Sequence, residues 1–133
     1  MIIGIGMDVI TVARIARIWE RHRMRFAQHV LTPAEIDELN GVADAARFIA
    51  KRWAAKEAFA KAAGTGMRAP LKWNGIGVAH DQFGRPELVF APFIHAWLAR
   101  RKVERWHVSI SDERDLACAV VVLEAPETNN VAA

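Results

Sequence analysis

The sequence contains a single cysteine, Cys118, and no long hydrophobic run. One cysteine excludes an internal disulfide framework and a zinc site built from several thiolates, and it favours the reducing cytosol as the compartment. No stretch approaches the ~18 consecutive apolar residues of a membrane span. The N-terminus lacks a basic start and reaches an acid early, at Asp8, so we expect no signal peptide.

Several sequence motifs of catalysis are also missing. There is no phosphate-binding glycine loop of the P-loop type and no HExxH zinc motif. Ser109 and Ser111 lie near His107, but the nucleophile elbow G-x-S-x-G is absent. Because a serine nucleophile also needs a third group and an oxyanion hole, the pattern argues against a serine hydrolase.

The composition of the 133 residues is typical of a globular domain, with 53% hydrophobic and 25% charged residues. This length predicts one domain over residues 1–125, followed by a small polar tail over 126–133 that we expect to be disordered. The net charge of +3 is unevenly spread, since residues 10–30 sum to +4 and residues 47–72 to +6. Such concentration favours an anionic partner, although solvated helix faces give the same counts.

The N-terminal part of the sequence predicts a strand followed by a basic helix. Residues 2–10 are apolar with two glycines, which is typical of a buried strand that another backbone or a ligand approaches closely. After this strand, apolar residues recur at helical spacing, and another face carries Arg14, Arg17, Arg21 and Arg25. We therefore expect one amphipathic helix with an arginine stripe.

Further helices and strands follow along the chain. Thr32 and Glu35 predict a capping box at the start of a short helix. The longest helical pattern covers residues 44–63, where alanines between charged side chains leave room for a bulky group to lie against the helix. The remaining patterns predict strands over 74–80, 87–90, 106–111 and 116–124, a helix over 92–102 and a turn over 112–115. Together they indicate an α+β fold.

Two carboxylates stand out among the basic residues. Asp8 ends an apolar strand, where an ionised carboxylate needs a partner or exposure, and Glu57 lies amid positive charge on the long helix. Mg²⁺ commonly binds one or two carboxylates together with substrate phosphates, and lysines would neutralise the remaining phosphate charge. We therefore consider a shared site for Mg²⁺ and a phosphate; separate salt bridges for the two acids are the alternative.

Blocks around these acids match a known family in order and spacing, over residues 2 to about 124. They are IGIGMDVI (3–10), RFIAKRWAAKEA (47–58), KAAGTG (61–66), GRP (84–86), HVSISDE (107–113) and ACAV (117–120). In these blocks the chain resembles the holo-acyl-carrier-protein synthases, the short, single-domain type of 4′-phosphopantetheinyl transferase. The resemblance implies an antiparallel sheet packed against the long helix, and a homotrimer with each active site between two subunits.

The resemblance also implies a reaction. The 4′-phosphopantetheine arm of coenzyme A is transferred to a serine of apo acyl carrier protein, which releases adenosine 3′,5′-bisphosphate and supports fatty acid biosynthesis. Asp8 and Glu57 match the family's Mg²⁺ ligands, Lys61 matches the lysine beside the pyrophosphate, and His107 matches a histidine near the active site. Where some members carry a further histidine this chain has Asp112, so no role of that histidine is transferred.

Two more groups of residues match the family's binding regions. Gly64, Thr65 and Gly66 match the loop near the bound coenzyme A. Arg14 and Arg21 fall on the helix that meets the carrier protein, which is acidic. An arginine face of this kind would speed the encounter with such a partner, and more at low salt than at high salt.

Two other classes of function fit parts of the sequence. A basic nucleic-acid-binding module would use the arginine helix for phosphate contacts and the five tryptophans for stacking, but their wide spacing instead indicates core or subunit contacts. A purely structural oligomer built on the apolar strand over 116–123 gives no reason for Asp8 and Glu57. Cys118, in that strand, is expected to be a buried packing residue.

Overall fold

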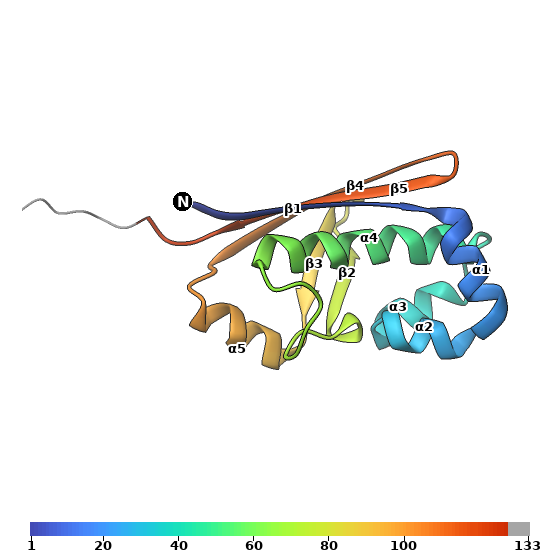
Figure 1. Ribbon diagram of the computed structural model, residues 1–133, viewed down its shortest axis with the longest axis horizontal. Helices are drawn as coiled ribbons and strands as arrows, with labels where there is room; N and C mark the ends of the chain where they lie inside the picture. The colour runs from blue at the N-terminus through green and yellow to red at the C-terminus, as the bar shows by residue number, and fades with distance from the viewer. Residues whose placement is uncertain (128–133) are drawn as a thin grey trace, which may run out of the picture.

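A three-stranded antiparallel sheet lies over one side of the longest helix, and a two-stranded antiparallel sheet lies on the other side (Figure 1). The computed structural model describes residues 1–127. Its elements are β1 (Ile2–Thr11), α1 (Val12–His22), α2 (Met24–Val30), α3 (Pro33–Leu39), α4 (Ala45–Ala63), the 3₁₀ turn η1 (Trp73–Gly75), β2 (Ile76–His80), β3 (Pro86–Phe90), α5 (Pro92–Arg100), β4 (Arg105–Glu113) and β5 (Leu116–Glu124). The α+β class predicted from the sequence is confirmed. Most of the tail predicted over 126–133 lies outside the described residues.

Helix α4 forms the centre of the molecule and is buried over more than half of its 19 residues. It starts where Oδ1 of Asp44 accepts a hydrogen bond from the Arg47 backbone, and it ends at Gly64, which takes a left-handed φ of 80°. The space expected beside its alanines is filled by the protein's own sheet, since Ala54 and Ala58 are fully buried. Among the described residues, neither α4 nor any other helix combines the length and apolar character needed to span a membrane.

Strand β1 approaches α4 at backbone contact distance because Gly4 and Gly6 have no side chains. A Cβ atom on Gly6 would lie 2.0 Å from the carbonyl oxygen of Ala58, and one on Gly4 would lie 2.0 Å from that of Ala62. The close approach predicted from the two glycines is therefore made by the backbone of α4. Asp8 follows Gly6 by two residues, so its side chain shares the strand face that points toward the helix.

The basic helix predicted after β1 is interrupted at Arg23, which takes a φ of 48° between α1 and α2. The break lets the two helices take different directions, so that Ile15 of α1 and Phe26 of α2 are both buried. The expectation of one continuous arginine stripe is therefore wrong at its end, because Arg25 belongs to α2.

The hairpin between β4 and β5 is tighter than the sequence suggested. Strand β4 continues to Glu113, so only Arg114 and Asp115 remain in the turn that we expected over 112–115. Arg114 takes a φ of 52°, and positive φ values are typical of two-residue hairpin turns. The hairpin end lies beside the first turn of α4, where Arg47 donates to Oδ2 of Asp112 and to the carbonyl oxygen of Arg114.

Strand β5 is the central strand of the sheet and alternates between its two faces. Ala119 and Val121 are buried toward α4, whereas Val120 is exposed on the outer face. Cys118 shares the outer face and is only half-buried, so the prediction of a buried packing residue is wrong. The sequence of this strand is apolar on both faces, which hides the alternation.

Candidate active site

The two acids singled out in the sequence lie together with Lys61 where β1 passes over α4. The ammonium nitrogen Nζ of Lys61 is 3.1 Å from Oδ1 of Asp8 and 3.0 Å from the carbonyl oxygen of Met7. Glu57 precedes Lys61 by one helical turn, so both side chains project from the same face of α4. Asp8 is only 15% exposed at its side chain and is close enough for its charge to act on Glu57.

The electrostatics of this cluster favour a cation. Partial burial raises the pKa of Glu57, the negative charge of Asp8 raises it further, and the positive charges of Lys61 and Arg14 oppose both effects. Two repelling carboxylates supply hard oxygen ligands, the donor type that Mg²⁺ prefers. Across residues 1–127 no group of three or more acidic, histidine or cysteine side chains could hold a metal ion. A metal at Asp8 and Glu57 would therefore take its other ligands from water or substrate oxygens.

The loop that follows α4 lies one turn beyond Lys61. The backbone N–H of Gly64 donates to the carbonyl oxygen of Lys61, and Gly66 takes a φ of 65°. The hydroxyl of Thr65 donates to the carbonyl oxygen of Gly66. Left-handed φ values are easily adopted only by glycine, which explains the glycines on both sides of Thr65. Asp8, Glu57 and Lys61 together are called the acid–lysine cluster. The three loop residues predicted to lie near coenzyme A thus adjoin this cluster.

Helix α1 brings an exposed arginine face to the same region. Arg14 is in its first turn and acts electrostatically on Glu57. Arg21 follows two turns later, and both arginines are exposed. The arginine face therefore begins beside the acid–lysine cluster and leads away from it along the helix.

His107 lies on the other face of the sheet, away from the acids of the same chain. Alternate residues of β4, His107 among them, are exposed on this outer face, whereas Asp8 of β1 points toward α4. His107 lines a polar cavity of about 330 Å³ between β3 and β4, which Arg85 and Pro86 also line. A single chain thus does not bring His107 to Asp8 and Glu57, and its role at the site stays a prediction.

The sequence profile of the 4′-phosphopantetheinyl transferase superfamily matches residues 4–121. The chain belongs to this superfamily. The match spans β1, α4 and the loop after it, and therefore includes all the residues of the acid–lysine cluster.

Within this superfamily the similar proteins are holo-[acyl-carrier-protein] synthases. The one from Laribacter hongkongensis is 53% identical over 124 residues, which are 93% of this chain and 99% of that protein. The crystal structure of the Neisseria meningitidis synthase has a TM-score of 0.90 at 42% identity, covering 93% of this chain and 99% of that one. A Bacillus anthracis synthase solved in complex with coenzyme A has a TM-score of 0.80 at 34% identity, covering 95% and 99%. The resemblance predicted from the sequence is confirmed, and with it the enzyme class of phosphopantetheinyl transferase.

A buried ion cluster on α4, the helix that also carries Glu57 and Lys61, was missed in the sequence. Lys56, the residue before Glu57, is 0% exposed; its ammonium nitrogen lies 2.7 Å from Oε1 of Glu35 and also donates to the carbonyl oxygen of Val30. Arg52 is 5% exposed, and its Nε atom lies 3.5 Å from Oε2 of Glu35. Desolvation lowers the pKa of Lys56 to about 8, although Glu35 acts in the opposite direction.

Glu35 therefore has more than the helix-capping role predicted from the sequence. The capping box is present, with the Thr32 backbone N–H donating to Glu35 Oε1 at 2.9 Å. The other oxygen of Glu35 accepts from the backbone of Val78 at 3.0 Å. This carboxylate connects α3, α4 and β2. The sequence does contain a sign that Arg52 and Lys56 are its partners. Both residues lie, at helical spacing, on the apolar face of α4 that runs from residue 48 to residue 59.

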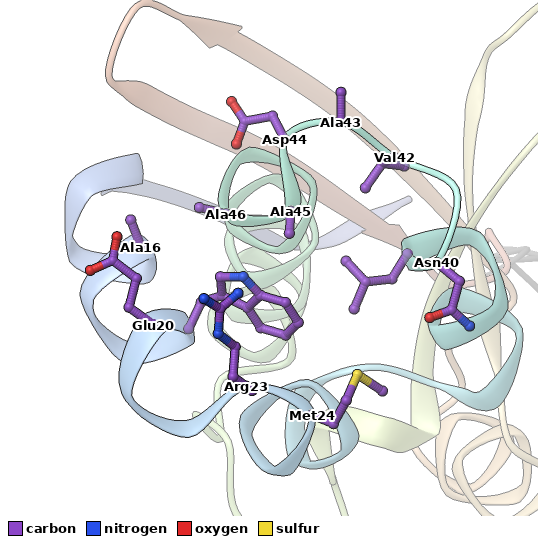
Figure 2. A pocket seen from close by; sticks show the side chains of 12 residues that line it. Ala16, Glu20, Arg23, Met24, Asn40, Val42, Ala43, Asp44, Ala45 and Ala46 are labelled. Atoms are coloured by element: carbon purple, nitrogen blue, oxygen red, sulfur yellow. The ribbon is translucent and has the colours of Figure 1, made fainter.

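A separate hollow of about 710 Å³ lies between α1, the start of α2 and the start of α4. Figure 2 shows the side chains that line it. Glu20 and Arg23 line one side of it, Asn40 and Val42 another, and Ala45 lies at the beginning of α4. None of the predicted site residues lines it. The hollow is thus distinct from the acid–lysine cluster.

Proposed function

We propose that this protein transfers the 4′-phosphopantetheine group from coenzyme A to a serine of apo acyl carrier protein, in a Mg²⁺-dependent reaction that supports fatty acid biosynthesis. The observation that carries the proposal is the juxtaposition of Asp8, Glu57 and Lys61 where β1 crosses α4. Support comes also from the similar synthases, one of which is in complex with coenzyme A. The single cysteine favours the cytosol as the compartment.

Each residue of the acid–lysine cluster would have a different role in the transfer. Asp8 and Glu57 would hold Mg²⁺, which supplies Lewis acidity and a template for pyrophosphate oxygens when bound. Lys61 would place its positive charge beside the pyrophosphate, and the loop over 64–66 would adjoin the cofactor. The serine hydroxyl loses its proton to water and its oxygen bonds to the phosphorus that carries the pantetheine arm. The bond from this phosphorus to the bridging oxygen breaks, and adenosine 3′,5′-bisphosphate leaves. Catalysis here consists of positioning and charge stabilisation.

We propose the homotrimer that the family resemblance implies, and the outer face of the sheet supports packing against further copies of the chain. Ile3, Ile5, Met7 and Val9 are 46%, 64%, 59% and 52% exposed on this face, a large apolar surface for a monomer. His107 lies on the same face. A second copy of the chain packed there would cover the apolar side chains and bring His107 toward the cluster of a neighbouring subunit. Sedimentation equilibrium should give three times the mass of one chain, and a monomer mass would contradict the assembly.

The structure argues against the alternative function as a nucleic-acid-binding module, because the tryptophans that would stack with bases are engaged within the protein. All five tryptophans are partly buried and pack against the hydrophobic core. The rings of Trp53 and Trp73 stack on each other at 4.1 Å between centroids, and the indole N–H of Trp106 donates to the carbonyl oxygen of Leu88. Tryptophans engaged in this way are not available for stacking with bases.

A product mass measurement tests the proposed function. The protein is incubated with coenzyme A, Mg²⁺ and apo acyl carrier protein, and the carrier protein is then weighed by intact mass spectrometry. The proposal predicts that the carrier protein gains the mass of the phosphopantetheine arm, and that chelation of divalent cations abolishes the gain. An unchanged carrier protein, or a gain that persists after chelation, contradicts the proposal as stated.

Charge reversal on α1 tests the docking of the carrier protein. We expect Arg21→Glu to raise the KM for acyl carrier protein about tenfold and to leave the KM for coenzyme A almost unchanged, because the arginine meets only the acidic partner. Arg14→Glu should act in the same direction. Arg100→Glu, an equal charge change at an exposed position of α5, serves as the control. Equal effects of Arg21→Glu on both KM values would show that α1 is not the docking face.

A further inference from the structure

The imidazole ring of His107 is held by a carboxylate from the neighbouring strand. His107 on β4 pairs with Val122 of β5, and Glu124 reaches it diagonally across the two strands. Nε2 of His107 lies 2.7 Å from Oε2 of Glu124, and Nε of Arg105 lies 3.4 Å from the same oxygen. The Glu124 side chain is 22% exposed and that of His107 is 47% exposed. One ring nitrogen of the histidine is thus engaged within the chain, and the other has no partner there among the described residues.

The charge of Glu124 determines where the ring carries its proton. The hydrogen bond from His107 lowers the pKa of Glu124; partial desolvation opposes this, and the charges of Arg105 and of the Met1 amino group lower the pKa further. Glu124 is therefore ionised at neutral pH, and an ionised carboxylate can only accept hydrogen bonds. Nε2 of His107 must then carry a proton in both charge states of the ring. Nδ1 is left as the nitrogen that can meet a ligand.

We propose that Glu124 is a positioning residue for His107, which it holds in the Nε2–H form so that Nδ1 is presented to coenzyme A. The inference rests on the proposed function for the identity of the ligand. His107 lines the polar cavity between β3 and β4, whose other charged residues are Arg85 and Glu87. A ring fixed in tautomer and direction loses no binding energy to reorientation, as for histidines oriented by carboxylates at metal sites.

Steady-state kinetics of five variants test this role. We expect Glu124→Ala to lower kcat/KM for coenzyme A by about tenfold or more, as loss of an orienting carboxylate does elsewhere. Glu124→Gln should recover most of this loss, because its amide oxygen still accepts from Nε2. The double variant Glu124→Ala/His107→Ala should lose no more than His107→Ala alone, since the two residues act as a unit. Glu113→Gln, at an exposed position of β4, the strand that carries His107, is the control.

Two kinetic results would overturn the proposal: full activity of Glu124→Ala, or losses at Glu124 and His107 that multiply in the double variant. A nitrogen-15 NMR measurement of the neutral His107 ring gives a readout that needs no transfer activity. The wild-type ring should be entirely in the Nε2–H form, and Glu124→Ala should show both tautomers. A wild-type ring protonated at Nδ1 alone would refute the pairing. If the wild type shows no transfer, the proposed function is contradicted. The NMR measurement would then still test whether Glu124 fixes the tautomer of His107.

Discussion

Replacing Asp8 by asparagine is expected to lower the rate of phosphopantetheine transfer at least about a hundredfold, because one of the two proposed anionic Mg²⁺ ligands becomes neutral. Glu57→Gln should have an effect of the same order. The folded state should survive both changes, since the substitutions keep the shape of the side chains and remove the repulsion that raises the pKa of Glu57. Transfer rates and thermal unfolding of the same samples measure the two effects separately.

A matched variant and a second readout sharpen this prediction. Asp37→Asn makes the same chemical change at an exposed position of α3 and should leave the rate unchanged. Mg²⁺ should raise the unfolding temperature of the wild type, because a ligand that binds only the folded state stabilises it. This increase should vanish in Asp8→Asn. Wild-type rates in both Asp8→Asn and Glu57→Gln would exclude the two acids from the reaction.

Replacing Lys56 by methionine is expected to reduce the free energy of unfolding by about 3–5 kcal/mol. The substitution removes a fully buried positive charge, so the equally buried carboxylate of Glu35 keeps only Arg52 as a charged partner. Leaving a buried charge poorly compensated is costly because the protein interior solvates it far less than water does. Denaturant unfolding at a fixed protein concentration measures the loss.

A double-mutant cycle separates the ion pair from the packing of the side chains. Lys56→Met combined with Glu35→Gln should be less destabilising than the sum of the single changes, since the second substitution removes the unpaired charge. Lys72→Met, at an exposed position, should change stability by no more than about 0.5 kcal/mol. Strict additivity within the cycle would contradict the account of Lys56 and Glu35 as one electrostatic unit.

The sequence was informative about the acids of the site because each stands out from its local pattern. Asp8 ends an apolar strand, and the glycines before it indicate a close backbone contact. Which backbone makes that contact depends on the packing of β1 against α4, which local patterns do not encode. The capping box of Glu35, in contrast, could be predicted because it involves only residues that are close together in the sequence.

Features that depend on tertiary packing were beyond local patterns. The break at Arg23 occurs in a sequence with continuous helical spacing, because burying Phe26 outweighs continuing the helix. The burial of Lys56 is hard to distinguish from the exposure of Lys61 by composition alone. The pairing of His107 with Glu124 requires the register of β4 against β5, which a strand pattern leaves undetermined.

We propose that Asp8 and Glu57 hold one divalent cation together, and anomalous X-ray scattering is the decisive check. Crystals grown with coenzyme A and Mn²⁺, which accepts the same oxygen ligands as Mg²⁺, would locate the metal by its own signal. We expect one strong peak at roughly 2 Å from a carboxylate oxygen of each residue. A metal peak bound by other residues, with Asp8 and Glu57 free of it, would contradict the claim.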